Sequence, residues 1–275
     1  NDLDVPLIFQ QRLWGLPRMG APVDTYLLQD LIEGRLAPYK LYLFLNAFSL
    51  DRARREALAA ELRRDGQVAV WVYAPGYLDQ APDLEKMADL TGLRFGMGEH
   101  AWGPLIHVTD YEHPITQDLS QDLFWGTNAR LAPLFHLDDP SARILGEVVY
   151  SQGRCKPGFG LREFEAWASV YVAAPNLPSS VLRGLARYAG VHLYSDAGDV
   201  LYATPQLLCA HTVSGGPRTF VLPRKVEVVY DLFEQGVVAR DADRFRVTLA
   251  PRSTALYFTG DRALLAALDG AQRKE

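Results

Sequence analysis

Nearly continuous apolar runs alternate with amphipathic segments in the first part of the chain. Residues 40–45 and 68–73 are apolar along almost their whole length, which is typical of strands buried on both faces of a sheet. Residues 49–64 and 83–90 carry apolar side chains at helical spacing, with charged residues between them. Strands and helices that alternate with short connections indicate βαβ units, so the pattern predicts an α/β domain around a parallel sheet.

Capping residues support the two predicted helices. Ser49 can cap the first helix and Gly66 can end it, whereas Asp83 can cap the second. The following segment, residues 94–165, has brief apolar runs among Gly, Pro, Asp and His, and it fits either two β-hairpins or an excursion from the sheet.

The α/β pattern returns after residue 165. Residues 168–173 form another apolar run, and residues 179–189 have helical spacing that ends at Gly190. Two short strands are predicted next, at residues 192–194 and 200–203, with a turn between them.

The period of the pattern changes after Thr204. Short apolar runs now recur every seven to ten residues with turn residues between them, which predicts a small antiparallel β-domain. The five runs are residues 219–222, 226–230, 236–239, 245–249 and 254–258. We therefore expect an α/β domain over residues 1–212, a β-domain over residues 213–260, and a tail over residues 261–275 that forms a short helix.

Composition narrows the class of protein. The 275 residues are 48% hydrophobic and 22% charged, as in ordinary globular proteins, and 28 basic against 33 acidic groups give a net charge of −5. This charge disfavours nucleic-acid binding. No run approaches the roughly 20 apolar residues of a membrane span, so we expect no membrane insertion. The first twenty residues hold four charged ones and no signal-peptide core, which leaves a cytoplasmic and a secreted location open.

The chain begins at Asn1 rather than at Met. We interpret it as a processed protein or as an excised part of a longer one.

The carboxyl ends of the first two strands are the first place to look for chemistry, because ligands gather there in open parallel sheets. Asn46 and Tyr77 follow these strands, and both are candidate ligand or interface residues. The sharp turn before Tyr77 has Pro75 and Gly76 at its tip, and neither has a nucleophilic atom. We interpret it as a turn that ends a strand, with a disarmed active site as the alternative.

Other candidates for catalysis are isolated. Cys155 lies between Arg154 and Lys156, which could lower the pKa of its thiol, but no spacing connects it to a base. Cys155 and Cys209 form no CxxC pair, and we expect two buried free thiols rather than a disulfide. The six histidines are scattered singly, so we expect no metal site, and no nucleotide-binding motif is found. No cofactor is expected.

Aromatic and acidic residues are candidates for contact with a sugar or a partner. Trp102 and Trp125 lie in the irregular segment and could form an exposed stacking platform. Asp196 and Asp199 lie close together, although a Ser-Asp-Ala-Gly-Asp sequence favours a turn first.

Four segments in order resemble the trimerisation domain of family 42 β-galactosidases and related large glycoside hydrolases. They are residues 20–31 (GAPVDTYLLQDL), 39–48 (YKLYLFLNAF), 70–77 (VWVYAPGY) and 191–203 (VHLYSDAGDVLYA). Residues 229–233 (VYDLF) and 254–257 (TALY) resemble the small C-terminal β-domain of the same enzymes. The resemblance spans about residues 15–258.

This resemblance implies an open, mostly parallel sheet flanked by helices, flavodoxin-like and similar to class I glutamine amidotransferases. It also implies contact between subunits, typically in a trimer, a wall for a neighbouring sugar site, and a preceding catalytic (β/α)8 barrel. The catalytic glutamates of the family belong to that barrel, so none is assigned here. The chain departs from true amidotransferases, because Ala74-Pro75-Gly76-Tyr77 replaces their glycine-flanked cysteine and His192-Leu193-Tyr194 replaces their His-x-Glu pair.

The hypothesis that follows is a non-catalytic oligomerisation and substrate-wall portion of a β-galactosidase-like glycoside hydrolase. Its partners would be further copies of the chain, an upstream barrel and an oligosaccharide. The alternatives are an autonomous carbohydrate-binding module that uses Trp102 or Trp125, and a degenerate amidotransferase-like hydrolase that uses Cys155.

Overall fold

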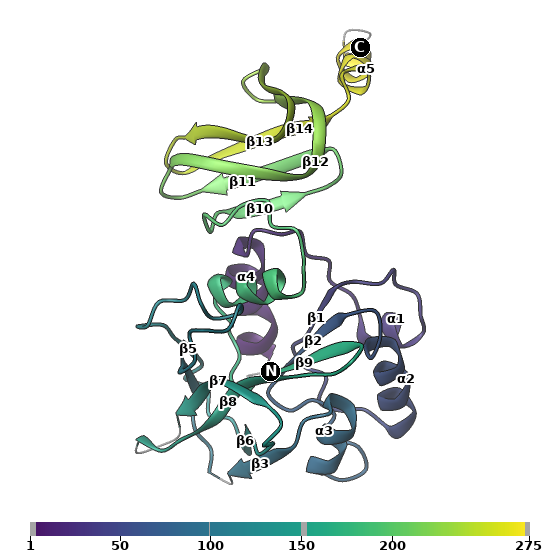
Figure 1. Ribbon diagram of the computed structural model, residues 1–275, viewed down its shortest axis with the longest axis vertical. Coiled ribbons are helices and arrows are strands. Elements are labelled where there is room, and N and C mark those ends of the chain that lie inside the picture. The colour runs from purple at the N-terminus through teal and green to yellow at the C-terminus, as the bar shows by residue number, and fades with distance from the viewer. Residues whose placement is uncertain (1–3, 99, 150–152, 273–275) are drawn as a thin grey trace. The chain divides into compact units, whose positions relative to one another are not determined.

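The computed structural model describes residues 4–98, 100–149 and 153–272 (Figure 1). The chain divides into two compact units. The α/β unit contains the chain up to Gly15 and Asp24–Val191, and the β unit contains Leu16–Val23 and the chain from His192 onward. The division after Val191 lies about twenty residues before the expected boundary at residue 212, because the strands at residues 200–203 and 207–212 pair into the sheet of the β unit.

The α/β unit is built on a seven-stranded mixed sheet in the order β1-β2-β9-β8-β7-β4-β5. Its strands are β1 (Leu41–Phe44), β2 (Gln67–Val72), β4 (Leu105–Val108), β5 (Phe124–Gly126), β7 (Arg143–Val149), β8 (Cys155–Glu163) and β9 (Trp167–Val172). Two of the six pairings, β1–β2 and β2–β9, are parallel, and the other four are antiparallel. The expected mostly parallel sheet is therefore not confirmed, because residues 105–163 extend it with antiparallel strands.

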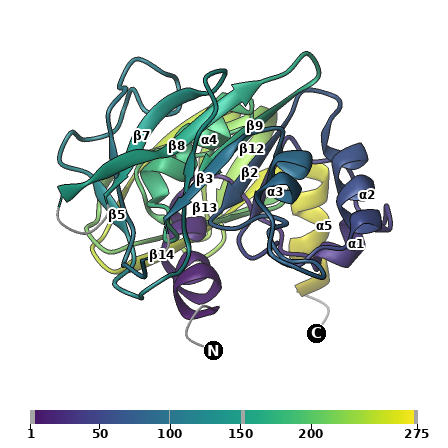
Figure 2. The same cartoon turned by 90° about the horizontal axis from the view of Figure 1, so that it is seen from below.

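The parallel part of the sheet agrees with the apolar pattern. Every residue of β2 and β9 is buried, and Trp71 of β2 stacks on Phe44 of β1 with ring centroids 4.4 Å apart. Three helices, α1 (Leu28–Ile32), α2 (Arg52–Leu62) and α3 (Leu84–Thr91), gather beside this part of the sheet, away from β5 and β7 (Figures 1 and 2). The α/β unit is thus covered by helices where its strands are parallel.

The helix boundaries follow the capping residues with one difference. The side chain of Asp83 caps α3, as predicted, but α2 begins after Asp51, whose carboxylate accepts a hydrogen bond from the amide of Arg54. Ser49 is instead bridged to Leu78, which prevents it from capping α2. The predicted third helix is present as α4 (Ser179–Tyr188).

The irregular middle segment contains both expected alternatives. Strands β4, β5 and β7 continue the main sheet, whereas β3 (Phe95–Gly98) and β6 (Leu134–Leu137) form a separate antiparallel ladder. The N-terminal helical segment of the unit consists of wide π-type turns, η1 (Val5–Phe9) and η2 (Gln11–Gly15).

The β unit is a five-stranded antiparallel sheet in the order β10-β11-β14-β12-β13. Its elements are η3 (Leu16–Arg18), β10 (Val200–Ala203), β11 (Leu207–Thr212), β12 (Gly216–Asp231), β13 (Gly236–Leu249), β14 (Ser253–Gly260) and α5 (Arg262–Gln272). The antiparallel β-domain is confirmed, but four of the five predicted runs merge pairwise into β12 and β13. The segment around Pro223 continues β12 through an irregular register instead of turning. The predicted strand at residues 192–194 is not formed.

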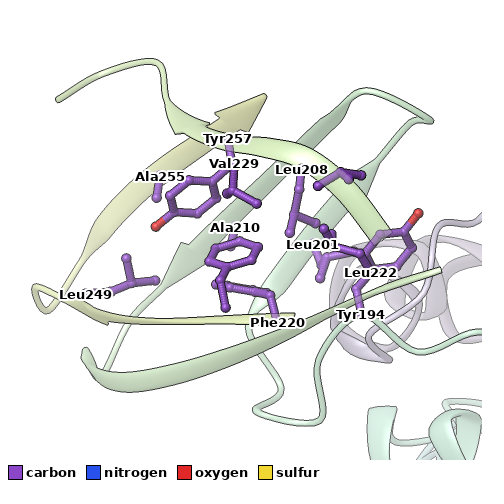
Figure 3. Packing of buried hydrophobic residues seen from close by; sticks show 12 residues of the cluster. Tyr194, Leu201, Leu208, Ala210, Phe220, Leu222, Val229, Leu249, Ala255 and Tyr257 are labelled. Carbon is purple, nitrogen blue, oxygen red and sulfur yellow. The ribbon is translucent and has the colours of Figure 1, made fainter. Parts of the chain in front are cut away.

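The core of the β unit lies on one face of this curved sheet (Figure 3). The rings of Phe220, Phe245 and Tyr257 contact one another at centroid distances of 5.0 to 5.9 Å. Leu201 and Leu208 from β10 and β11 belong to the same cluster, which explains why these two strands fold with the β unit.

Candidate functional site

The carboxyl ends of β1 and β2 are joined by backbone hydrogen bonds. The amide of Gly76 donates to the carbonyl oxygen of Ala47 over 2.7 Å, and the amide of Leu78 donates to that of Phe48 over 2.8 Å. Asn46 is exposed beside this junction. Gly76 has φ +68°, and a β-carbon there would lie 3.1 Å from Leu90 and 3.3 Å from Arg55, so glycine suits both the conformation and the space. The tight turn expected at Pro75-Gly76 is confirmed.

The strained residue at the end of β2 is Tyr73, which the sequence pattern did not reveal. It follows the last strand residue directly and has φ +67°, a conformation uncommon for a non-glycine residue. A nucleophile elbow places its Ser or Cys on a strained turn directly after a strand. Tyr73 thus has the position after a strand and the backbone strain of such an elbow, but its side chain is not a Ser or Cys nucleophile.

The side chain of Tyr73 fills this position rather than exposing it. It is 6% exposed, and its hydroxyl donates to the carbonyl oxygen of Pro133 over 2.9 Å. Its ring contacts Phe48 and Phe135 edge-on, and Tyr77 packs against Phe135 with centroids 4.8 Å apart. Burial raises the pKa of Tyr73 to about 12, with a smaller contribution from Tyr77. The neutral, buried phenol of Tyr73 contributes to packing, so aromatic side chains fill the turn directly after β2.

Cys155 lies at the start of β8 and is exposed, contrary to the expected buried thiol. Partial burial and the neighbouring Glu147 carboxylate raise its pKa, so the expectation that adjacent cations lower it is wrong. Glu147 also lies 3.8 Å from Nε2 of His107. A raised thiol pKa disfavours the thiolate that nucleophilic catalysis requires. Cys209 on β11 is half-buried, and both cysteines are free.

The two candidate tryptophans differ in exposure. Trp102 is 43% exposed, and its backbone forms a bridge with Leu131. Trp125, on β5, is 5% exposed and packs edge-on against Phe159, so it is a core residue and not an exposed platform. Only Trp102 of the pair retains a surface that a sugar ring could stack on.

The two candidate aspartates lie in the β unit. Asp196 is exposed. Asp199 pairs with the guanidinium of Arg218, which also donates to the hydroxyl of Thr212 over 2.7 Å. The Asp199 carboxylate therefore holds the turn to β12, and its role as a ligand-binding residue stays a prediction.

Within residues 4–98, 100–149 and 153–272, no group of three or more His, Cys, Asp or Glu side chains is arranged to hold a metal ion. In the same part of the chain, no helix has both the length and the apolar composition that crossing a membrane demands.

Comparison with solved structures places the fold. No protein-family model and no curated protein matches the sequence. The chain is similar to the β-galactosidase from Bacillus circulans sp. alkalophilus (TM-score 0.61, 14% identity), covering 88% of this chain and 36% of that one. The β-galactosidase from Rahnella sp. R3 (TM-score 0.60, 14% identity) is similar over 88% and 35%, and that from Halorubrum lacusprofundi (TM-score 0.57, 12% identity) over 94% and 36%.

A family 42 β-galactosidase, Gan42B, shows the same relation, with a TM-score of 0.57 over 91% of this chain and 35% of that enzyme. The resemblance noted in the sequence is thus present in the fold. The chain spans about a third of the length of the β-galactosidases that it resembles.

Proposed function

We propose that the chain is a non-catalytic oligomerisation and substrate-wall portion of a β-galactosidase-like glycoside hydrolase. The observation that carries this proposal is the likeness of fold, which extends over 88–94% of this chain but over only 35–36% of each β-galactosidase. A likeness of that extent fits one portion of a larger enzyme. The trimeric state and the catalytic barrel before this portion belong to the same proposal.

The closed elbow supports the non-catalytic role. The parallel strands β1, β2 and β9, with α2 and α3 beside them, are compatible with the proposed amidotransferase-like framework, in which a nucleophile would follow a buried strand such as β2. Tyr73 occupies that turn as a packed, neutral ring.

An exposed apolar stripe on the N-terminal helical segment supports assembly. Its members are 49–72% exposed: Val5, Phe9 and Leu13 recur every four residues, and Trp14 follows Leu13 directly. The opposite side of this segment is anchored, because the buried side chain of Gln11 donates to the carbonyl oxygen of Leu177 and accepts from its amide, over 3.0 and 2.8 Å. A stripe held in this way is ordered before a partner arrives, which lowers the entropic cost of association.

Sedimentation velocity at several concentrations tests the assembly role. We expect concentration-dependent self-association of the chain and an association constant at least about tenfold lower in a Leu13→Ser/Trp14→Ser variant, since each buried apolar side chain contributes about 1.5–3 kcal/mol. Leu264→Ser, which replaces an exposed leucine of α5, is the matched control. A chain that stays monomeric at all concentrations would contradict the proposal, and so would hydrolysis of nitrophenyl glycosides at enzyme-like rates.

A carbohydrate-binding module remains a second candidate, because the ring of Trp102 is available for stacking. Calorimetry with galactosides tests it: the wild-type chain should release heat, and Trp102→Ala should lose most of it. For the hydrolase alternative, Cys155→Ala should abolish any measurable hydrolysis, and activity that survives the substitution eliminates Cys155 as the nucleophile.

A further inference from the structure

The α/β unit contains an open pocket of about 480 Å³ between segments that are far apart in the sequence. Four polar residues line it, namely Gln10, Thr127, Asn128 and Asn176, and the rest of the lining comes from Val5, from Gly126 at the end of β5 and from Ala129 in the following loop. The volume lies within the range of small-molecule sites. None of these residues belongs to the elbow or to the candidates inferred from the sequence.

Asn176 is the unusual residue of this pocket. It lies four residues beyond the last residue of β9 and has φ +61°, in the left-handed region. Its amide nitrogen donates to the carbonyl oxygen of Gly126 over 2.9 Å, which fixes the orientation of the amide. Its Oδ1 is then buried without a hydrogen-bond partner among the described residues. A buried acceptor of this kind is destabilising unless a donor satisfies it.

The loop opposite Asn176 is held by its own backbone. A β-carbon on Gly126 would overlap the carbonyl oxygen of Pro104, and the amide of Thr127 donates to that same oxygen over 3.2 Å. The hydroxyl of Thr127 accepts from the amide of Ala129 over 3.0 Å. The polar groups of this loop are therefore positioned in advance.

The other side of the pocket is fixed as well. Gln10 precedes Gln11, and Asn176 precedes Leu177, so the two hydrogen bonds between Gln11 and Leu177 hold both lining residues in place. A binding site built on such anchored segments loses little conformational entropy when a ligand arrives.

The lining identifies the class of ligand. Three amides and one hydroxyl supply both donors and acceptors, and no lining residue is charged. An anion or a cation would lose its hydration without a compensating charge, whereas a ligand with several neutral hydroxyl groups can both donate and accept. We propose that this pocket binds a neutral polyhydroxylated ligand, a hexopyranose unit. The choice of a galactoside as the sugar rests on the proposed function. The existence of the pocket and the polarity of its lining are independent of that function.

Calorimetric titration of the full chain with methyl β-D-galactopyranoside tests the proposal. We expect a dissociation constant on the order of millimolar, as for a ligand of this size. Gln10→Ala and Asn128→Ala should each weaken binding about fivefold, since both replace exposed side chains and remove one neutral hydrogen bond. Asn176→Gly, which tolerates the left-handed backbone, should abolish measurable binding. Gln80→Ala is the control, because Gln80 is an exposed amide of the same unit that does not line the pocket.

The outcomes separate this proposal from the assembly role. Binding that depends on Asn128 and Asn176, with galacturonate binding at least fivefold more weakly, supports the pocket. An absence of binding to methyl galactoside, methyl glucoside and methyl mannoside overturns it, even if the chain self-associates through its apolar stripe. Binding that is lost in Trp102→Ala but retained in the three pocket variants also overturns it, since the sugar would then use the tryptophan. Thermal melting of each variant verifies that it is folded.

Discussion

Strands β2 and β9 lie side by side in parallel and end in matching sequences, but their ends differ in chemistry. Residues 70–76 read Val-Trp-Val-Tyr-Ala-Pro-Gly, and residues 170–176 read Val-Tyr-Val-Ala-Ala-Pro-Asn. Both segments finish in the left-handed conformation, at Gly76 with φ +68° and at Asn176 with φ +61°. The two segments thus share a left-handed residue at the same position after Ala-Pro, but only the end of β2 has a second one, at Tyr73.

The surroundings of the two segments make one end closed and the other polar. After β2, Tyr73 fills the space with an aromatic ring, and a side chain at Gly76 would require Leu90 and Arg55 to shift slightly. After β9, the position that corresponds to Tyr73 is Ala173, and the amide of Asn176 lines an open pocket. Two neighbouring strands can thus end at the same edge of a sheet with different surroundings, one packed with aromatic rings and one lining a polar pocket, according to their side chains.

The largest expected effect on stability comes from removing the aromatic side chain of Tyr73, directly after β2. Tyr73→Ala should lower the free energy of unfolding by about 3–5 kcal/mol, because it leaves a cavity among Phe48 and Phe135. Denaturant titration measures this loss. Tyr73→Phe is the matched control and should cost about 1 kcal/mol for the hydrogen bond to Pro133. A loss below 1 kcal/mol for the alanine variant would mean that the ring does not support the fold.

The stability of the segment after β9 should depend on the two hydrogen bonds between Gln11 and Leu177. Gln11→Ala leaves the amide and the carbonyl of Leu177 buried without their partners, and we expect it to lower the free energy of unfolding by about 2–3 kcal/mol. Gln10→Ala, at the exposed neighbouring position, should stay within about 0.5 kcal/mol of the wild type. Equal losses in the two variants would show that Gln11 does not anchor the segment.

Exchanging the terminal residues tests the comparison directly. Gly76→Asn retains the left-handed backbone but pushes a side chain against Leu90 and Arg55, so we expect a loss of about 1–3 kcal/mol. Asn176→Gly should change stability by less than about 1 kcal/mol while it removes sugar binding. If neither exchange changes stability in thermal and chemical unfolding, the packing at the two strand ends does not differ in its contribution to the free energy of unfolding.

The smallest expected effect is a dependence of stability on pH. His136, on β6 beside Phe135, has a pKa lowered by burial and by the nearby Lys156, with Asp138 acting in the opposite direction. A lowered pKa means that the unfolded chain binds the proton more readily than the folded one. The contribution of His136 is therefore complete above its unfolded pKa of about 6.5 and declines as the pH falls below that value.

Unfolding curves between pH 7.5 and 5 measure this decline. His136→Asn should flatten it. An unaltered slope in His136→Asn would assign the dependence to other groups, such as His113, whose pKa is also lowered by burial.

Local patterns predicted a large share of the fold. Strands β1, β2 and β9 and helices α2, α3 and α4 were readable because buried parallel strands are continuously apolar and the helices carry apolar side chains at helical spacing. The middle segment was not readable, because β4 to β8 are short or irregular and alternate imperfectly. The expected boundary was residue 212, whereas the compact units divide after Val191, since the pairing of β10 with β11 and of β11 with the distant β14 leaves no local signal.

Local patterns likewise predicted some of the functional-site features and missed others. The turn at Pro75-Gly76 was correctly predicted from residue types alone. The backbone strain of Tyr73 was hidden, since an aromatic residue at the end of an apolar run reads as one more strand residue. Asn176 was overlooked although a signal existed, because its Ala-Pro-Asn sequence repeats the Ala-Pro-Gly that ends β2.

By itself, the sequence determined the alternation of buried strands and amphipathic helices, the change to an antiparallel β region, and the turns that end β2 and β9, because these depend on near neighbours in the chain. Only the tertiary structure decided that the sheet is mixed, that Trp125 is buried, that the elbow is filled by Tyr73, and that Gln10, Asn128 and Asn176 line one pocket. These features join residues up to 166 positions apart. Burial and side-chain contact at such separations follow from packing, which no local pattern encodes.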